Sequence, residues 1–252
     1  MLRYVAPLRE GGSLPAIVEA DDLGTYVLKF RGAGQGPKVL IAELLAGEIG
    51  RLLGLPIPDI VFAELDPVLG RSEPDPEIQD LIAASAGLNL AVDYLPGAFA
   101  FDALDASGLD PELASAIVWF DAYVTNVDRT ARNPNMLTWH RKPWLIDHGA
   151  ALYAQYGGPD FAARARTRFP QIRDHILLSS AAALSEVDHR LAARLTPETI
   201  EQLVALIPDI WLEDRAVPDL ARQREAYASY LIDRLEPPRA FVEEAIHARQ
   251  LV

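Results

Sequence analysis

The chain has 252 residues and no cysteine, so disulfide bonds, thiolate metal sites and cysteine nucleophiles are excluded. It contains no run of about 18 uncharged apolar residues, the length that a membrane-spanning helix requires. Its first residues lack the apolar core of a signal peptide. We therefore expect a soluble, cytoplasmic protein without a membrane partner.

Basic residues are also scarce. The chain has 23 Lys and Arg against 36 Asp and Glu, which gives a formal net charge of -13. Nucleic acids and anionic lipid surfaces both bind basic patches, so neither is an expected partner. Half of the residues are hydrophobic, and the length suits one large domain or two lobes.

The most informative stretch covers residues 124–151. Residues 136–139 and 144–146 have the composition of two strands, and the polar residues 140–143 between them are typical of a turn. The pattern predicts a short β-hairpin.

Three polar side chains surround this hairpin: Asp128, Asn133 and Asp147. Asn133 and Asp147 stand at its open end, so folding should bring an amide oxygen and a carboxylate together, as a hard cation such as Mg²⁺ prefers. Asp128, on the preceding loop, is then placed to orient or deprotonate a hydroxyl group. Asp and Asn are also common in ordinary turns, but all three at this spacing favour a functional site.

The N-terminal region predicts an antiparallel sheet. Gly11, Gly12 and Ser13 lie between two predicted strands, where their N–H groups could bind phosphate oxygens, although Gly-Gly is also an ordinary hairpin turn. Strands are expected at residues 4–6, 16–20, 25–30 and 60–65.

Lys29 lies in the apolar strand 25–30. The simplest interpretation is a solvated strand lysine. The functional alternative is a lysine that binds the phosphates of ATP, which requires a carboxylate partner on a following helix.

Such a helix is predicted over residues 38–53, where apolar residues recur at helical spacing. Glu43 points away from this apolar stripe, next to Ala46, Gly47 and Gly50. A face of small residues implies close approach by another element, and a carboxylate on such a face usually has a partner. We therefore predict that Glu43 pairs with Lys29; Glu48, at the border of the stripe, is the competing candidate.

Residues 66–87 are polar and acidic and predict an excursion at the surface with a short helix at 77–85. Residues 88–97 predict a buried strand that leads into a connector. Asp110, followed by a proline, marks the start of a helix that supports the loop of Asp128. After residue 151 the chain reads as almost entirely helical, and its histidines, including His175, have no metal-ligand spacing and receive no role.

Two sets of motifs resemble the HipA-like kinases and the phosphoinositide-kinase-like branch of that fold. The first is Asn-x-Asp-Arg-x-x-x-Asn at 126–133, followed by Leu-Ile-Asp-x-Gly at 145–149. The second is the helical Glu43 followed by Gly-Leu-Pro-Ile-Pro at 54–58, which also favours Glu43 over Glu48. The motifs cover roughly residues 10 to 152, and the later helical region is similar only in kind.

The resemblance implies an α+β, two-lobed protein-kinase-like fold. The N-lobe, residues 1–95, would hold an antiparallel sheet and one main helix. The C-lobe, residues 96–252, would be mostly helical and carry the catalytic-loop hairpin at 124–151. The lobes would join near Asp93, Tyr94 and Leu95, whose backbone groups would bind an adenine unless they form only a linker.

The resemblance also implies ATP and Mg²⁺ as cofactors. Lys29 would contact the phosphates, Asp128 would orient the nucleophile, and Asn133 and Asp147 would hold the metal ion. Asn135 competes with Asn133, but the five-residue spacing from Asp128 favours Asn133.

The sequence departs from the family pattern at two positions. Thr130 occupies a position where relatives commonly have His, and His148 stands in the middle of the Asp-x-Gly motif where ordinary kinases have Phe.

The first hypothesis is therefore a kinase that acts on a serine or threonine hydroxyl of a protein. A pseudokinase that binds nucleotide or a partner, and a kinase of small alcohols, remain alternatives. A metal-assisted hydrolase is disfavoured because no third strong ligand accompanies Asp128 and Asp147. The sequence leaves the acceptor open between a protein and a small molecule.

Overall fold

The computed structural model describes the whole chain except residues 1–2, 9–13, 35 and 213–216. Its N-terminal half is built on a five-stranded antiparallel sheet of order β1-β2-β3-β5-β4. Strand β5 lies between β3 and β4, and its pairing places Lys29 opposite Leu90. The strands are β1 Arg3–Pro7, β2 Ala16–Glu19, β3 Thr25–Lys29, β4 Ile60–Leu65 and β5 Gly87–Asp93.

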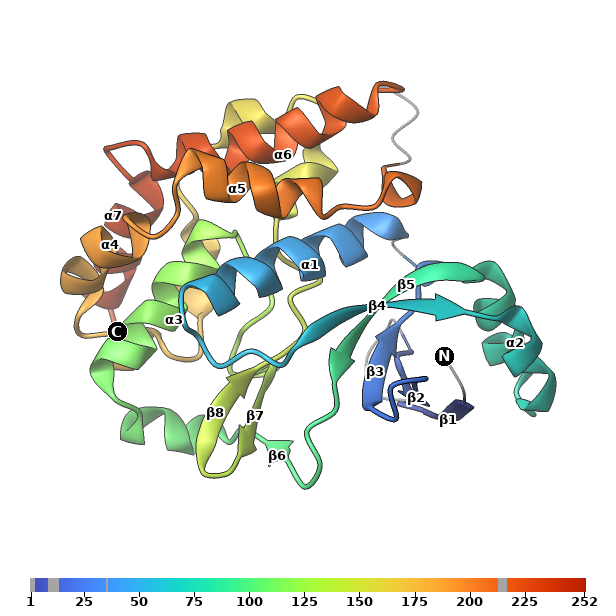
Figure 1. Ribbon diagram of the computed structural model, residues 1–252. Helices are drawn as coiled ribbons and strands as arrows, with labels where there is room; N and C mark the ends of the chain where they lie inside the picture. Colours follow the sequence, from blue (N-terminus) through green and yellow to red (C-terminus); the bar gives the residue numbers. More distant parts are fainter. Residues whose placement is uncertain (1–2, 9–13, 35, 213–216) are drawn as a thin grey trace.

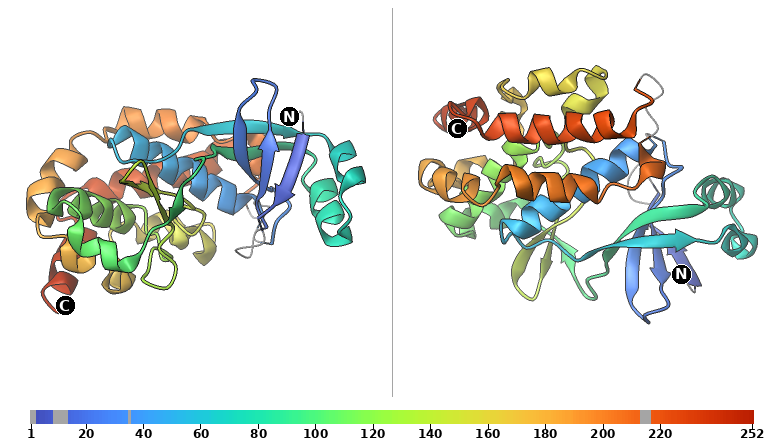
Figure 2. Two further views of the ribbon diagram at one scale, coloured as in Figure 1. Left: turned by 90° about the horizontal axis from the view of Figure 1, so that it is seen from below. Right: turned by 45° about the horizontal axis from the view of Figure 1, so that its top comes forward.

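A short helical segment covers one face of this sheet. It consists of the 3-10 helix η1 (Pro67–Ser72) and helix α2 (Pro76–Ala84), at the edge of the molecule farthest from helices α4 and α7 in Figures 1 and 2. Ile78 and Ile82 are buried in a small core against the sheet. The predicted excursion at 66–87 is thus attached to the sheet by one side of its helix.

Helix α1 (Pro37–Leu52) is buried along most of its length. It runs between the N-terminal sheet and the later helices (Figure 1). Its glycines permit this double contact. A Cβ atom on Gly47 would collide with the Ile60 side chain, and one on Gly50 would lie 3.2 Å from the Phe120 ring. The expectation that both sides of this helix are covered is confirmed.

The C-terminal part is mostly helical around helix α3 (Pro111–Tyr123), which begins at the predicted cap, where Asp110 accepts a hydrogen bond from the Leu113 amide. A second sheet of order β6-β7-β8 contains the predicted hairpin. Its strands are β6 Phe99–Ala100, β7 Met136–Trp139 and β8 Lys142–Leu145. The remaining helices are α4 Leu184–Ala192, α5 Pro197–Ala205, α6 Leu220–Leu235 and α7 Ala240–Arg249, with 3-10 helices η2 Ala103–Gly108, η3 Tyr153–Gly157, η4 Phe161–Arg164, η5 Pro170–Asp174, η6 Leu178–Ser180 and η7 Asp209–Trp211.

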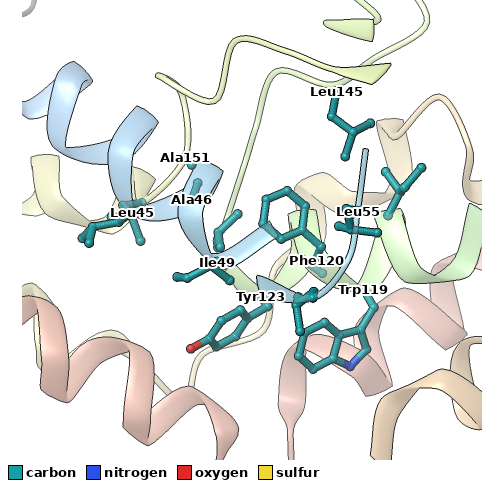
Figure 3. Packing of buried hydrophobic residues seen from close by; sticks show 14 of the residues in the cluster. Leu45, Ala46, Ile49, Leu55, Trp119, Phe120, Tyr123, Leu145 and Ala151 are labelled. Carbon is teal, nitrogen blue, oxygen red and sulfur yellow. The ribbon is translucent and has the colours of Figure 1, made fainter. Parts of the chain in front are cut away.

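The larger hydrophobic core joins α1 to α3 and to the helices that follow. Figure 3 shows Ile49 of α1 near Phe120 and Tyr123 of α3. Leu145, at the end of the hairpin, belongs to the same core. The main helix of the predicted N-lobe is therefore packed into the interior of the C-terminal part.

The antiparallel N-terminal sheet and the helical C-terminal part confirm the predicted fold class. Two local predictions need correction. The hairpin turn is two residues long, His140 and Arg141, both with positive φ, whereas a four-residue turn was expected. Residues 151–180 form short 3-10 helices instead of α-helices. Among the described residues, no helix is long and apolar enough to cross a membrane.

Truncation of α1 on its buried side should destabilise the protein. Leu45 is fully buried, whereas Leu52 of the same helix is 41% exposed. We expect Leu45→Ala to lower the free energy of unfolding by about 2–5 kcal/mol because it leaves a cavity. The matched control Leu52→Ala should change it by about 0.5 kcal/mol. Urea unfolding followed by circular dichroism measures both, and equal effects would contradict the assigned packing of α1.

Candidate active site

A buried lysine joins three distant parts of the chain. Lys29, at the end of β3, is 9% exposed. Its Nζ atom lies 2.6 Å from Glu43 Oε2 on α1 and 2.7 Å from Asp147 Oδ1 after β8. Glu48, the competing candidate, instead lies 3.0 Å from Arg51. The structure thus brings Lys29 together with Glu43 and Asp147, while Glu48 makes a separate pair.

The protonation of this cluster follows from its charges. Burial alone would lower the pKa of Lys29, but the carboxylates of Asp147 and Glu43 outweigh it and raise the pKa well above its usual range. Burial likewise opposes ionisation of Glu43, yet the charge of Lys29, with a smaller effect of His148, lowers the pKa of Glu43 to about 2. Lys29 and Glu43 are therefore both charged at neutral pH.

The residues after Asp147 fit closely against α1. His148 is buried, with Nδ1 3.6 Å from Glu43 Oε1 and its ring edge-on to Phe120. A Cβ atom on Gly149 would lie 2.6 Å from Val39 Cγ1, so the Asp-His-Gly segment could not pack here with a larger residue in third place. The histidine thus occupies an interior position beside the glutamate.

Asp128 is held on its loop by the two asparagines that compete for the metal role. Asn133 Nδ2 donates to Asp128 Oδ2 at 2.7 Å, and Asn135 Nδ2 donates to the same oxygen at 3.3 Å. Each amide thereby orients the Asp128 carboxylate with its nitrogen. The amide oxygen of Asn133 is not used in this contact, and Asn133 is exposed.

Asp121, on α3, forms hydrogen bonds that hold the loop of Asp128 in place. It is fully buried and accepts hydrogen bonds from Arg129 Nε at 2.6 Å and Asn126 Nδ2 at 2.8 Å, and its Oδ2 lies 2.9 Å from His175 Nε2. Burial opposes its ionisation, but the charge of Arg129 dominates and holds the pKa of Asp121 far below its usual range. It is a second buried carboxylate paired with a cation.

This network also fixes the segments around it. Arg129 donates to the carbonyl oxygen of Asn135 and, at 3.4 Å, to that of Ile146, the residue before Asp147. Asn126 Oδ1 accepts from the amide of Asp128 at 3.2 Å. Through Asn126 and Arg129, Asp121 therefore connects the loop of Asp128 to Ile146, the residue before Asp147.

Sequence reasoning missed Asp121 and His175. A detectable signal existed for Asp121, because it is the one carboxylate in the apolar run 116–124 of α3, and a buried charge needs a partner. His175 carried no such signal. Its partner lies 54 positions earlier in the chain.

Two of the backbone groups predicted to bind an adenine already have partners within the protein. The amide of Asp93 donates to the Asp59 carbonyl at 2.8 Å, and that of Tyr94 donates to the Thr25 carbonyl at 3.0 Å. These two N–H groups serve the sheet and are unavailable to a nucleotide. Leu95 is buried just beyond them.

The predicted phosphate loop, Gly11, Gly12 and Ser13, lies outside the residues that the structure describes.

Asp147 and Asn133 carry the types of oxygen donor that a hard cation prefers. Asp147 uses one oxygen for Lys29, yet its side chain is 51% exposed. Asn133 offers an amide oxygen beside Asp128. Within the described part of the chain, no group of three or more His, Asp or Glu side chains could enclose a metal ion. Two protein oxygens together with substrate phosphates and water suit Mg²⁺, which dehydrates reluctantly.

A pocket of about 300 Å³ lies elsewhere, between α6 and residues 155–163. None of Lys29, Glu43, Asp128 and Asp147 lines it. It is therefore separate from the cluster described above.

Two comparisons with known proteins gave matches. The family model described as HipA-like kinase matches residues 3–233. A search of curated proteins gave no significant match. The chain resembles the crystal structure of the Helicobacter pylori proinflammatory kinase CtkA, with a TM-score of 0.58, 12% sequence identity, and coverage of 99% of this chain and 98% of that one. At this identity the likeness concerns the fold.

Glu43 should make the protein sensitive to acid. Its pKa falls from 4.5 to about 2 on folding, so the ionised group stabilises the native state above pH 4.5 and this stabilisation is lost as the pH falls toward 2. A shift of this size corresponds to on the order of 3 kcal/mol. We expect Glu43→Gln to be less stable at pH 7 and to lose less stability between pH 5 and pH 2.

Urea unfolding at constant ionic strength over this pH range measures the difference. Glu225→Gln, which removes an exposed carboxylate on α6, is the control. Identical pH slopes for the wild type and Glu43→Gln would show that the ion pair with Lys29 does not stabilise the fold.

Proposed function

Because the chain belongs to the HipA-like kinase family, we propose that it transfers a phosphoryl group from ATP, with Mg²⁺, to a serine or threonine hydroxyl of a protein. One observation carries this proposal: Lys29 is held between Glu43 and Asp147. A lysine paired with a helical glutamate, next to a metal-binding aspartate, is the arrangement that protein kinases need for phosphoryl transfer.

Lys29 would bind the phosphates of ATP. Its ammonium group has three N–H donors, of which Glu43 and Asp147 receive two. The third remains for a phosphate oxygen. The glutamate is fixed by α1 and fully buried, so it would hold the ammonium in place when the nucleotide arrives.

Asn133 and Asp147 would hold Mg²⁺ through an amide oxygen and a carboxylate oxygen. When bound, the metal ion supplies positive charge that neutralises the phosphate oxygens during transfer. The loop position of Asp147 is fixed by the contact of Gly149 with α1, and that of Asn133 by its hydrogen bond to Asp128.

Asp128 would act on the acceptor. Its Oδ2 atom accepts from Asn133 and Asn135, which leaves Oδ1 to accept a hydrogen bond from the acceptor hydroxyl. As the hydroxyl oxygen bonds to the γ-phosphorus and the bond to ADP breaks, the hydroxyl proton would pass to this carboxylate. General-base assistance of this kind typically contributes about 10²–10⁴-fold to the rate.

The adenine would lie against the connector that follows β5. We propose the Leu95 amide as its donor, since the amides of Asp93 and Tyr94 are already used. We retain Gly11, Gly12 and Ser13 as the candidate phosphate loop and the division between residues 95 and 96 as the lobe boundary. The shared core of α1 and α3 implies that movement between the lobes is limited at that point.

The metal role predicts a specific loss of binding. We expect Asp147→Asn to weaken ATP affinity in the presence of Mg²⁺ by at least about tenfold, because it removes a charged oxygen ligand. Titration calorimetry with and without EDTA measures this. Asp233→Asn, an equal change at an exposed position on α6, should bind as the wild type does. Undiminished affinity of Asp147→Asn would overturn the metal assignment.

Asp128→Asn should separate chemistry from binding. We expect kcat to fall by about 10²–10⁴-fold while the Kd for ATP stays close to that of the wild type. Transfer of radiolabelled γ-phosphate, to the protein itself and to peptides, measures kcat. A wild-type protein that binds ATP with Mg²⁺ yet shows no transfer would identify the pseudokinase alternative instead.

A further inference from the structure

Arginine is concentrated in one segment of an otherwise acidic protein. Residues 161–173 contain no Asp or Glu, although the whole chain carries a net charge of -13. The basic residues of the segment are Arg164, Arg166, Arg168 and Arg173, and all four are exposed.

The end of this segment lies beside the loop of Asp128. Thr130 and His175 form an isolated antiparallel bridge, and the Ile176 amide donates to the Arg129 carbonyl at 3.2 Å. In an antiparallel register, residues two positions from the bridge face each other. Arg173 and Arg132, an exposed residue of the Asp128 loop, each stand two positions from this bridge, so the bridge joins the two short segments that carry them.

The stability of the fold depends little on the exposed arginines of this segment. The Arg173 side chain is 74% exposed, and its nearest carboxylate is that of its neighbour Asp174, at 3.7 Å. The Arg168 side chain is 62% exposed and lies 3.4 Å from Glu244. Exposed pairs of this kind contribute little to stability. Arg129 differs, because it is buried and paired with Asp121.

Resting on the proposed function, we propose that the acceptor is an acidic protein segment, in which Asp or Glu residues flank the serine or threonine that reaches Asp128. Arg132 and Arg173 would bind those carboxylates. On a surface with an excess of negative charge, exposed arginines attract an acidic segment more strongly than their surroundings do, so Arg132 and Arg173 would favour binding at this site. Arg166 and Arg168, earlier in the same segment, are also exposed, and several separate charges suit an extended peptide better than a small molecule.

Peptides of equal length test the proposal. Each contains one serine, flanked by Glu, by Gln or by Lys, and carries a fluorescein label. Anisotropy in the presence of ADP and Mg²⁺ gives Kd without requiring catalysis, and phosphate transfer gives kcat/KM. We expect the Glu peptide to bind at least about tenfold more tightly than the Gln peptide at low salt, and the difference to shrink at high salt because the charges are exposed.

Reversing the charge of Arg132 and Arg173 tests whether these two residues cause the preference for the Glu peptide. The double variant Arg132→Glu/Arg173→Glu should lose the preference for the Glu peptide, with the Kd for ATP unchanged. The control Arg3→Glu/Arg190→Glu makes the same change in net charge at exposed sites on β1 and α4 and should keep the preference.

The outcomes separate the two proposals. Equal transfer to all peptides, or a preference that survives in Arg132→Glu/Arg173→Glu, overturns the acidic-acceptor inference and leaves the kinase function standing. Binding of the Glu peptide that depends on Arg132 and Arg173, without any transfer, would show a binding site for an acidic segment but overturn the kinase function, and with it the role of that segment as acceptor. Efficient transfer to a small phosphorylated alcohol, with none to the Glu peptide, also overturns the inference.

Discussion

The buried ammonium group of Lys29 sets the geometry of this molecule. A charge in the interior is tolerated only when opposite charges surround it. Here those charges come from α1 and from the turn after β8, which are far apart in the sequence. Removing one partner of a buried pair typically destabilises a protein by about 3–5 kcal/mol. The sheet, the helix and the Asp147 segment are therefore held in one arrangement by a single side chain.

Asp121 is a second buried charge that needs partners, and it fixes the loop of Asp128. It is a buried carboxylate whose partner, Arg129, also binds the backbone next to Asp147. Glu43 and Asp121 stand on α1 and α3, and these two helices pack in the same core (Figure 3). The group proposed to bind phosphates and the group proposed to act on the acceptor are thus both positioned relative to one rigid interior. This arrangement supplies preorganisation without any movement of the core.

Local patterns made much of this fold predictable. The cap at Asp110 fixed the start of α3, and the glycines of α1 revealed that its second face was covered. Lys29 and Glu43 could be proposed as a pair because each was a charged residue on an otherwise apolar or small surface. In all these cases the information lay within a few residues of the position in question.

What could not be predicted depends on contacts between distant segments. The amides of Asp93 and Tyr94 looked available until β3 and the residue before β4 were seen to accept from them. The hydrogen bond between His175 and Asp121 requires the chain after β8 to return to α3, and no periodic pattern encodes that return. The two-residue turn at His140 and Arg141 depends on left-handed backbone at both positions, a conformation that residues other than glycine seldom adopt.

Arg129 and Arg132 are two arginines of the same loop, and their different burial gives them different roles. Arg129 is buried and donates to the Asp121 carboxylate and to the carbonyl oxygens of Asn135 and Ile146. Arg132, three positions later, is exposed and stands two positions from the bridge between Thr130 and His175. A guanidinium in the interior fixes geometry, because its removal leaves a buried carboxylate unpaired. The same group at the surface contributes almost nothing to folding, which is why we propose that Arg132 binds a ligand.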